Sequence, residues 1–409
     1  MTVTLQPPGS ATDYQITARQ GADYYRVFDD VPAADREIWE RAQGFIDQAA
    51  PRMAAAWDTA EYPLDLVRQL GELDLLTDGV SHPLLSTVSP LAAGLVNMEI
   101  SRGDGSLGTV IAVQAGLALR TLGLLGSPEQ QEKWLRPLAR AEVLGAFALT
   151  EPAHGSDSVA LETSARRDQD GWILRGAKKW IGNGASGGIT FVFARVDDPG
   201  ADDHGAVRCF LVPQDTPGYR GEVITRKASL RAIHQALITL DDVHLPADAL
   251  LPGARTFKDA ARVLLATRAG VAWSALGHAT ACYETALAYA QQRIQFGKPL
   301  AGFQLVQERL TQMLADLTSM QLHCRRIADL DSAETLAPTQ ASLAKYHNTR
   351  AARRVAATAR DLLGGNGILL DYGVAQHMAD IESIHTYEGT ESIQALLIGR
   401  DLTGRSAFA

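Results

Sequence analysis

Ala-rich helical periodicity from Phe257 onward is the feature that most constrains the fold of this chain. The stretch 256–293 is long enough for one helix of about 55 Å at a rise of 1.5 Å per residue. A further helical run covers 338–363. Between them, apolar residues alternate by four and three, the spacing of a helix-packing seam: Val306, Leu310, Met313, Leu317, Met320, Cys324 and Ile327. Together with short connections, this pattern predicts an antiparallel helical bundle.

Two parts of different texture precede the bundle. The pattern at 35–140 is helical, and Ser127, Pro128 and Gln130 form a capping box that predicts a helix start. Short β-type runs then occupy 145–253.

We therefore expect an α+β multidomain protein. It comprises an N-terminal helical domain at 1–142, a middle β-barrel-like or sandwich domain at 143–255, and a C-terminal four-helix bundle at 256–409.

Charge and composition exclude several classes of protein. The net charge of −9 and pI of about 5.6 argue against a protein that coats nucleic acid or an anionic membrane. Three scattered cysteines indicate neither a disulfide framework nor a zinc site, and no metal is expected. We find no run of about 18 apolar residues that would predict a membrane span. The first 30 residues carry acids and lack an apolar leader segment, so we expect a cytoplasmic protein.

One carboxylate stands out near the C-terminus. Glu388, in His385-Thr-Tyr-Glu-Gly-Thr-Glu-Ser-Ile-Gln394, lies on a Gly-flanked turn ahead of an apolar helical run, where it could act as a base. Alone this signal is weak, because Thr390 and Glu391 are also typical of an ordinary helix start. Trp180 is similarly ambiguous, because most tryptophans belong to the core.

Four further segments strengthen the interpretation of Glu388 as a functional residue: Leu149-Thr-Glu-Pro-Ala-His-Gly-Ser-Asp157, Lys179-Trp-Ile-Gly-Asn183, Arg293-Ile-Gln-Phe-Gly-Lys-Pro-Leu300 and Leu362-Leu-Gly-Gly-Asn-Gly-Ile368. In this order, with Glu388, they make the whole chain resemble the acyl-CoA dehydrogenase superfamily of flavoenzymes. Phrases such as Phe303-Gln-Leu-Val-Gln307 and Ala341-Ser-Leu-Ala-Lys345 are similar to its glutaryl-CoA dehydrogenase branch and to plant short-chain acyl-CoA oxidases.

The resemblance implies the acyl-CoA dehydrogenase fold and FAD as cofactor, with its adenosine half reached by a neighbouring subunit in a homotetramer built as a dimer of dimers. The implied FAD-binding residues are Phe147, Leu149, Thr150, Gly155, Ser156, Trp180, Ile181, Gly182, Arg293, Phe296, Gln304, Leu363, Gly364, Gly365 and Thr390. The residues implied to bind the acyl-CoA substrate are Ser156, Thr267, Arg268, Tyr387 and Gly389.

The implied reaction is α,β-dehydrogenation of an acyl-CoA thioester. Glu388 would remove the α-proton while the β-hydrogen leaves as hydride to the flavin. Some branches carry the base at the position of Thr267, and threonine cannot fill that role. Glutaryl-CoA enzymes bind the distal carboxylate with an Arg, and that position here is Gly108, with Ser101 in place of the accompanying Glu. We therefore expect a short acyl chain other than glutaryl.

Three hypotheses about activity remain open. A dehydrogenase would pass electrons from the reduced flavin to an electron-transfer flavoprotein, whereas an oxidase would reduce oxygen to hydrogen peroxide. The oxidase hypothesis remains because Gly182 replaces the residue, commonly Thr, that the family places near flavin N5. The missing side chain would leave room for a small molecule there. The third is a CoA- or FAD-binding protein without redox chemistry, or an acyl dehydrogenase with a carrier-protein-linked substrate in a biosynthetic pathway.

Overall fold

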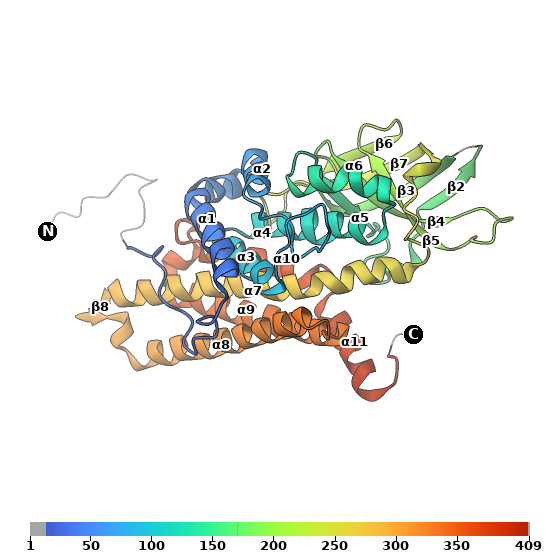
Figure 1. The fold of residues 1–409 in the computed structure, drawn as a ribbon. Coiled ribbons are helices and arrows are strands. Elements are labelled where there is room, and N and C mark those ends of the chain that lie inside the picture. Colours follow the sequence, from blue (N-terminus) through green and yellow to red (C-terminus); the bar gives the residue numbers. More distant parts are fainter. Residues whose placement is uncertain (1–13, 170, 408–409) are drawn as a thin grey trace.

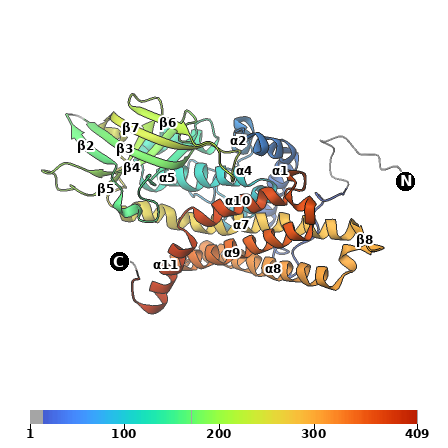
Figure 2. The same ribbon diagram turned by 180° about the vertical axis from the view of Figure 1, so that it is seen from behind.

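A computed structural model describes residues 14–169 and 171–407 of the chain. Figures 1 and 2 show the N-terminal helices and the β sheet lying side by side along one long helix, α7, with α8 and α9 on the other side of it. The first 13 residues, on which part of the leader argument depends, lie outside the described residues.

The C-terminal part is the predicted bundle. Its helices are α7 (Phe257–Gln292), α8 (Gln304–Ser332), α9 (Pro338–Leu362), α10 (Val374–Thr386) and α11 (Glu391–Thr403). Thr256 and Asp259 form a capping box that starts α7, and the single helix predicted over 256–293 is confirmed.

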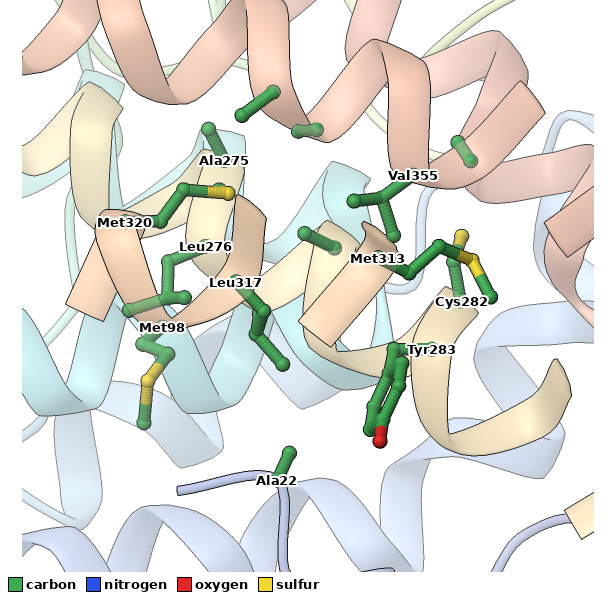
Figure 3. Packing of buried hydrophobic residues seen from close by; sticks show 14 of the residues in the cluster. Ala22, Met98, Ala275, Leu276, Cys282, Tyr283, Met313, Leu317, Met320 and Val355 are labelled. Carbon is green, nitrogen blue, oxygen red and sulfur yellow. The ribbon is translucent and has the colours of Figure 1, made fainter. Parts of the chain in front are cut away.

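The predicted α8 seam lies in the bundle core. Met313 is 1% exposed and Leu317 and Met320 are fully buried, so the methionines pack as core side chains. Figure 3 shows these residues among Leu276 and Cys282 of α7.

The N-terminal part is helical as expected. Its elements are α1 (Ala33–Thr59), α2 (Leu64–Glu72), α3 (Pro90–Gly103), α4 (Gly105–Ile111), the π-helix η1 (Ala112–Leu119), α5 (Arg120–Leu125) and α6 (Pro128–Ala139). The capping box predicted at Ser127 and Gln130 begins α6. Helix α3 packs against α7, which joins the two helical parts.

One segment corrects the expectation about membrane spans. The stretch Gly105–Leu125 is long and apolar enough to cross a membrane, judged by length and composition alone, with a mean hydropathy of 1.5. Gln114, Arg120 and four glycines interrupt the apolar run without lowering its mean hydropathy enough to remove it. Since 67% of its most apolar window is buried inside the protein, the segment serves as a core helix here. The cytoplasmic location stays a prediction.

The middle part is one seven-stranded sheet with the order β1-β4-β2-β3-β7-β6 and β5 paired to β4. Its strands are β1 (Gly145–Ala148), β2 (Ser164–Asp168), β3 (Gly171–Gly182), β4 (Ile189–Val196), β5 (Val207–Pro213), β6 (Tyr219–Val223) and β7 (Gln235–Pro246). Only the pairs β1-β4 and β2-β4 are parallel among these strands. The predicted fold class is confirmed: helical ends and a β middle.

Candidate active site

Glu388 lies on the turn between α10 and α11, in a left-handed conformation with φ of +55°. Gly389 comes next at φ +89°, and a Cβ there would lie 2.6 Å from the side-chain nitrogen of Gln394. That nitrogen donates to the carbonyl oxygens of Glu388 at 3.1 Å and Gly389 at 3.0 Å. Thr390 caps α11 as predicted, its hydroxyl accepting from the backbone N–H of Ile393. The conformation of this turn is therefore stabilised by Gly389, which leaves room for Gln394, and by the hydrogen bonds from the Gln394 side-chain amide.

The Glu388 carboxylate faces α7. The hydroxyl of Thr267 donates to it at 2.5 Å. Burial raises the pKa of Glu388 above its usual range, whereas the Thr267 hydrogen bond and the positive charges of Lys345 and Arg268 oppose that rise. Arg268 is itself 8% exposed and donates to the hydroxyl of Ser342 at 3.1 Å. Glu388 is thus a buried carboxylate with a raised pKa, which suits a group that takes up a proton.

Trp180 is presented to solvent by an irregularity in β3. The register of β3 and β7 shifts between Lys178 and Ile181, and Trp180 adopts φ of +65° with 55% of its surface exposed. Exposure of so large an apolar ring excludes the interpretation of Trp180 as a core residue. The backbone N–H of Lys179 donates to the carbonyl of Thr150 at 2.9 Å, which sets the Thr150 loop beside Trp180.

The Thr150 loop is supported from below by a buried ion pair. Lys178, fully buried, donates to Glu151 at 2.8 Å and to the carbonyl of Leu149 at 3.1 Å. Gly155 and Ser156 remain exposed further along the loop. In contrast, Phe147, Leu149 and Ile181 are buried in the cores around the sheet. An exposed ring face beside a polar loop fits the edge and face of a flavin.

The π-helix η1 connects this surface with Glu388. A Cβ on Gly182, at the end of β3, would lie 2.8 Å from the Val113 side chain. One turn along η1, a Cβ on Gly116 would lie 3.4 Å from Thr267, the partner of Glu388. The end of β3 and Thr267 of α7 therefore both lie beside η1. Turns of π-helix often occur at functional sites. The expectation that Gly182 leaves free space is wrong at this position, because Val113 fills it.

Uncharged hydroxyl groups line the neighbourhood of Tyr387 and Gly108. The Tyr387 hydroxyl hydrogen-bonds with Thr109 and Ser274, and Ser274 lies 2.9 Å from the hydroxyl of Ser101. A Cβ on Gly108 would lie 2.2 Å from that same Ser101 oxygen.

The nearest cation along the chain is already paired. Arg102 contacts Glu284 at 2.6 Å and is largely buried. Ser101 therefore occupies the space that the missing Gly108 side chain would have used, and Arg102 is held by a partner of its own.

The second group of predicted FAD residues lies at the opposite end of α7. Arg293 caps that end and donates to the Tyr14 hydroxyl at 3.0 Å, and Phe296, on the β8–β9 hairpin (Ile294–Gln295, Lys298–Pro299), is 94% exposed. Gln304 starts α8, and Leu363, Gly364 and Gly365 come directly after α9. From Thr267 to Arg293 the helix covers about 39 Å, and Figure 1 shows the β8 tip far from the sheet. The two groups of predicted FAD residues therefore lie far apart within one chain.

Sequence reasoning missed three features of the site. Val113 and Ser101 occupy space left by glycines, and nothing in their own positions signals this. In the sequence, Lys345 was noted only as the last residue of the segment Ala341-Ser-Leu-Ala-Lys345. In the structure it is 1% exposed and donates to the backbone carbonyls on both sides of Glu388. A lysine at an otherwise apolar helix position was the available signal.

Comparison with known proteins gives three domain matches. The acyl-CoA dehydrogenase N-terminal domain matches residues 32–142, the middle domain residues 146–243 and the C-terminal domain residues 257–403. Mitochondrial short-chain specific acyl-CoA dehydrogenase of Bos taurus is 33% identical over 377 residues, covering 91% of each chain.

Two similar proteins have solved structures. Glutaryl-CoA dehydrogenase of Mycobacterium smegmatis is 39% identical with a TM-score of 0.91, covering 96% of this chain and 100% of that chain; a glutaryl-CoA dehydrogenase of that organism has also been solved in complex with FADH2. Butyryl-CoA dehydrogenase of Megasphaera elsdenii is 28% identical with a TM-score of 0.86, covering 91% and 99%.

Proposed function

This chain belongs to the acyl-CoA dehydrogenase family, and from that premise we propose that it dehydrogenates a short, uncharged acyl-CoA thioester between the α and β carbons, with Glu388 as the base. The family consists of FAD-dependent oxidoreductases that act on the CH–CH group of acyl-CoA. The observation that carries the proposal is the hydrogen bond from Thr267 to the Glu388 carboxylate, because Thr267 lies beside the same π-helix as the end of β3.

The chain's residues fit FAD. Trp180 offers an exposed ring face, Thr150 lies beside it, and Ser156 is exposed further along the same loop. When bound, FAD supplies the acceptor for the β-hydrogen as hydride, chemistry that no side chain provides. Thr267 orients the Glu388 carboxylate, and the raised pKa of Glu388 matches a base that takes a proton from carbon. The backbone N–H of Glu388 is the group that, in the family, hydrogen-bonds the thioester carbonyl and acidifies the α-carbon.

The preference for an uncharged chain is supported by the hydroxyl cluster. Ser101, Thr109, Ser274 and Tyr387 present no fixed charge, and Arg102 is neutralised by Glu284. A distal carboxylate entering this region would be buried without a cation, which costs several kcal/mol. We therefore rank glutaryl-CoA behind butyryl-CoA and its branched analogues as substrate.

Electron-transfer flavoprotein is the acceptor that we propose for the second half-reaction. Val113 packs where the Gly182 side chain would be, so the glycine opens no space for oxygen at that position. Closed packing beside a reduced flavin favours a dehydrogenase over an oxidase.

We further propose a homotetramer, built as two dimers, in which Arg293, Phe296 and Gln304 serve FAD bound mainly by the neighbouring chain. Its support is the separation of the two FAD-binding groups along α7 and the exposure of Phe296.

Anaerobic bleaching of the flavin by a panel of acyl-CoA thioesters tests the proposed function. We expect rapid bleaching with butyryl- or isobutyryl-CoA and slow return of colour when air is admitted. A protein that binds FAD and acyl-CoA without bleaching under any of these substrates would contradict the proposal.

A further inference from the structure

Lys345 is a buried cation in direct contact with the turn that carries Glu388. It lies on α9, is 1% exposed, and forms no salt bridge with a carboxylate among the described residues. Its ammonium group instead donates to the carbonyl oxygen of Tyr387 and, at 2.6 Å, to that of Gly389. Those two carbonyls belong to the residues immediately before and after Glu388.

Two carbonyls held by one cation fix the local backbone path. A left-handed conformation costs a non-glycine residue about 1 kcal/mol or more, so Glu388 keeps its φ of +55° only if its surroundings favour that conformation. The side chain of Gln394 also donates to the carbonyls of Glu388 and Gly389. Lys345 and Gln394 together leave the turn little freedom to rotate the carboxylate away from α7.

We propose that Lys345 is a positioning residue for the base: by binding the carbonyls on both sides of Glu388, its ammonium group holds the left-handed turn that aims the carboxylate at the substrate. This inference rests on the proposed function, since it presumes that Glu388 takes the α-proton. It adds a residue from α9 to a site otherwise built from α7, η1, β3 and the α10–α11 turn.

The charge of Lys345 has a second effect on Glu388. Burial lowers the pKa of the Lys345 ammonium and raises that of the Glu388 carboxyl, while the attraction between the two opposes both shifts. The other charged groups near this pair are Arg268 on α7 and Asp78, which act on Glu388 in opposite directions, and His385 on α10, whose pKa Lys345 helps to lower. Removal of the Lys345 charge therefore raises the pKa of Glu388, and the base needs a higher pH to ionise.

The test compares Lys345→Met, Lys345→Arg and a matched control, Lys227→Met. Lys227 also donates to backbone carbonyls, those of Leu230 and Ile233, but stands in the segment after β6 rather than beside Glu388. Each variant is first checked for FAD content. Two quantities are then measured: the limiting rate of flavin reduction by butyryl-CoA against pH, and the affinity for pivaloyl-CoA, which lacks an α-hydrogen and so cannot be dehydrogenated.

We expect Lys345→Met to bind pivaloyl-CoA as the unmodified protein does, yet to lose about 100-fold in limiting rate, the scale of a misplacement of ~1 Å. Its apparent pKa should move up by about one unit. Lys345→Arg, which keeps the charge and the donors, should recover most of the rate, and Lys227→Met should reduce the flavin normally.

An unchanged rate and pH profile in Lys345→Met would overturn the inference, as would equal losses of rate and pivaloyl-CoA affinity. Failure of Lys345→Arg to recover more than Lys345→Met, with FAD retained, would overturn it as well. The parallel variant Glu388→Gln separates the role of Lys345 from the proposed function. If Glu388→Gln and Lys345→Met both reduce flavin normally, the assignment of Glu388 as the base fails. If Glu388→Gln is inactive while Lys345→Met is active, only the role of Lys345 fails.

Discussion

The hydroxyl of Thr267 lies 2.5 Å from the Glu388 carboxylate and 3.1 Å from the carbonyl oxygen of Leu264. A hydroxyl has one proton and can also accept, so it can serve both protonation states of the base. When Glu388 is ionised, Thr267 donates to it. Once Glu388 has taken a proton, Thr267 can accept from the carboxylic acid and donate to Leu264.

Thr267→Val removes that hydrogen bond while keeping the shape of the side chain. Because the hydrogen bond favours the ionised carboxylate, its loss should raise the pKa of Glu388 still further. The pH profile of flavin reduction should move to higher pH, so that activity falls most at acidic pH and recovers as pH rises. Thr267→Ser should keep the original profile, and a shift of the valine variant to lower pH would show that the hydroxyl does not act on the ionised form.

The preference against glutaryl-CoA can be measured by stopped-flow reduction. Butyryl-CoA should reduce the flavin about 100-fold faster than glutaryl-CoA, since the distal carboxylate of glutaryl-CoA would be buried without a partner. Glu284→Gln should narrow the gap by freeing Arg102 from its carboxylate partner. Faster reduction by glutaryl-CoA in the unmodified protein would mean that a cation elsewhere reaches the end of the acyl chain.

Val113 provides a test of the oxygen argument. Val113→Ala should enlarge the space beside Gly182 and speed the reoxidation of the reduced enzyme by air several-fold, with matching hydrogen peroxide. Val110→Ala makes the same substitution at a buried position on α4 and serves as the control. Rapid reoxidation of the unmodified protein, without any other acceptor, would identify an oxidase despite the packing at Gly182.

Assembly should be coupled to FAD binding. Arg293→Ala should lower FAD occupancy although Arg293 is remote from Trp180, because it would contact FAD of the neighbouring chain. Arg262→Ala, an exposed arginine near the other end of α7, is the control. Sedimentation should give a tetramer, and a stable monomer with full FAD content would contradict the two-chain site.

Particular residues show how far the sequence predicts this structure. The capping box at Ser127 and the α8 seam are local signals, and the elements they begin or cover are present as predicted. The free space around a residue depends on distant parts of the chain, which local sequence signals do not describe. Gly182 predicted a gap, yet Val113 of η1 fills it, and a π-helical turn has no reliable sequence pattern.

Partners of buried polar groups were equally hidden. The sequence singled out Glu388, but it could not show that Lys345, 43 residues earlier on α9, holds the carbonyls beside it. Trp180 illustrates the same limit, since its exposure results from one shift in the pairing of β3 with β7. Such contacts depend on how elements pack, whereas helix starts depend on neighbouring residues alone.

The most direct test of the account compares the unmodified protein with Glu388→Gln in anaerobic stopped-flow reduction by butyryl-CoA. The amide keeps the shape of the side chain but cannot accept the α-proton. We predict that the variant keeps its FAD and binds pivaloyl-CoA normally, yet reduces its flavin more slowly by several orders of magnitude. Near-normal reduction in Glu388→Gln would show that another group is the base.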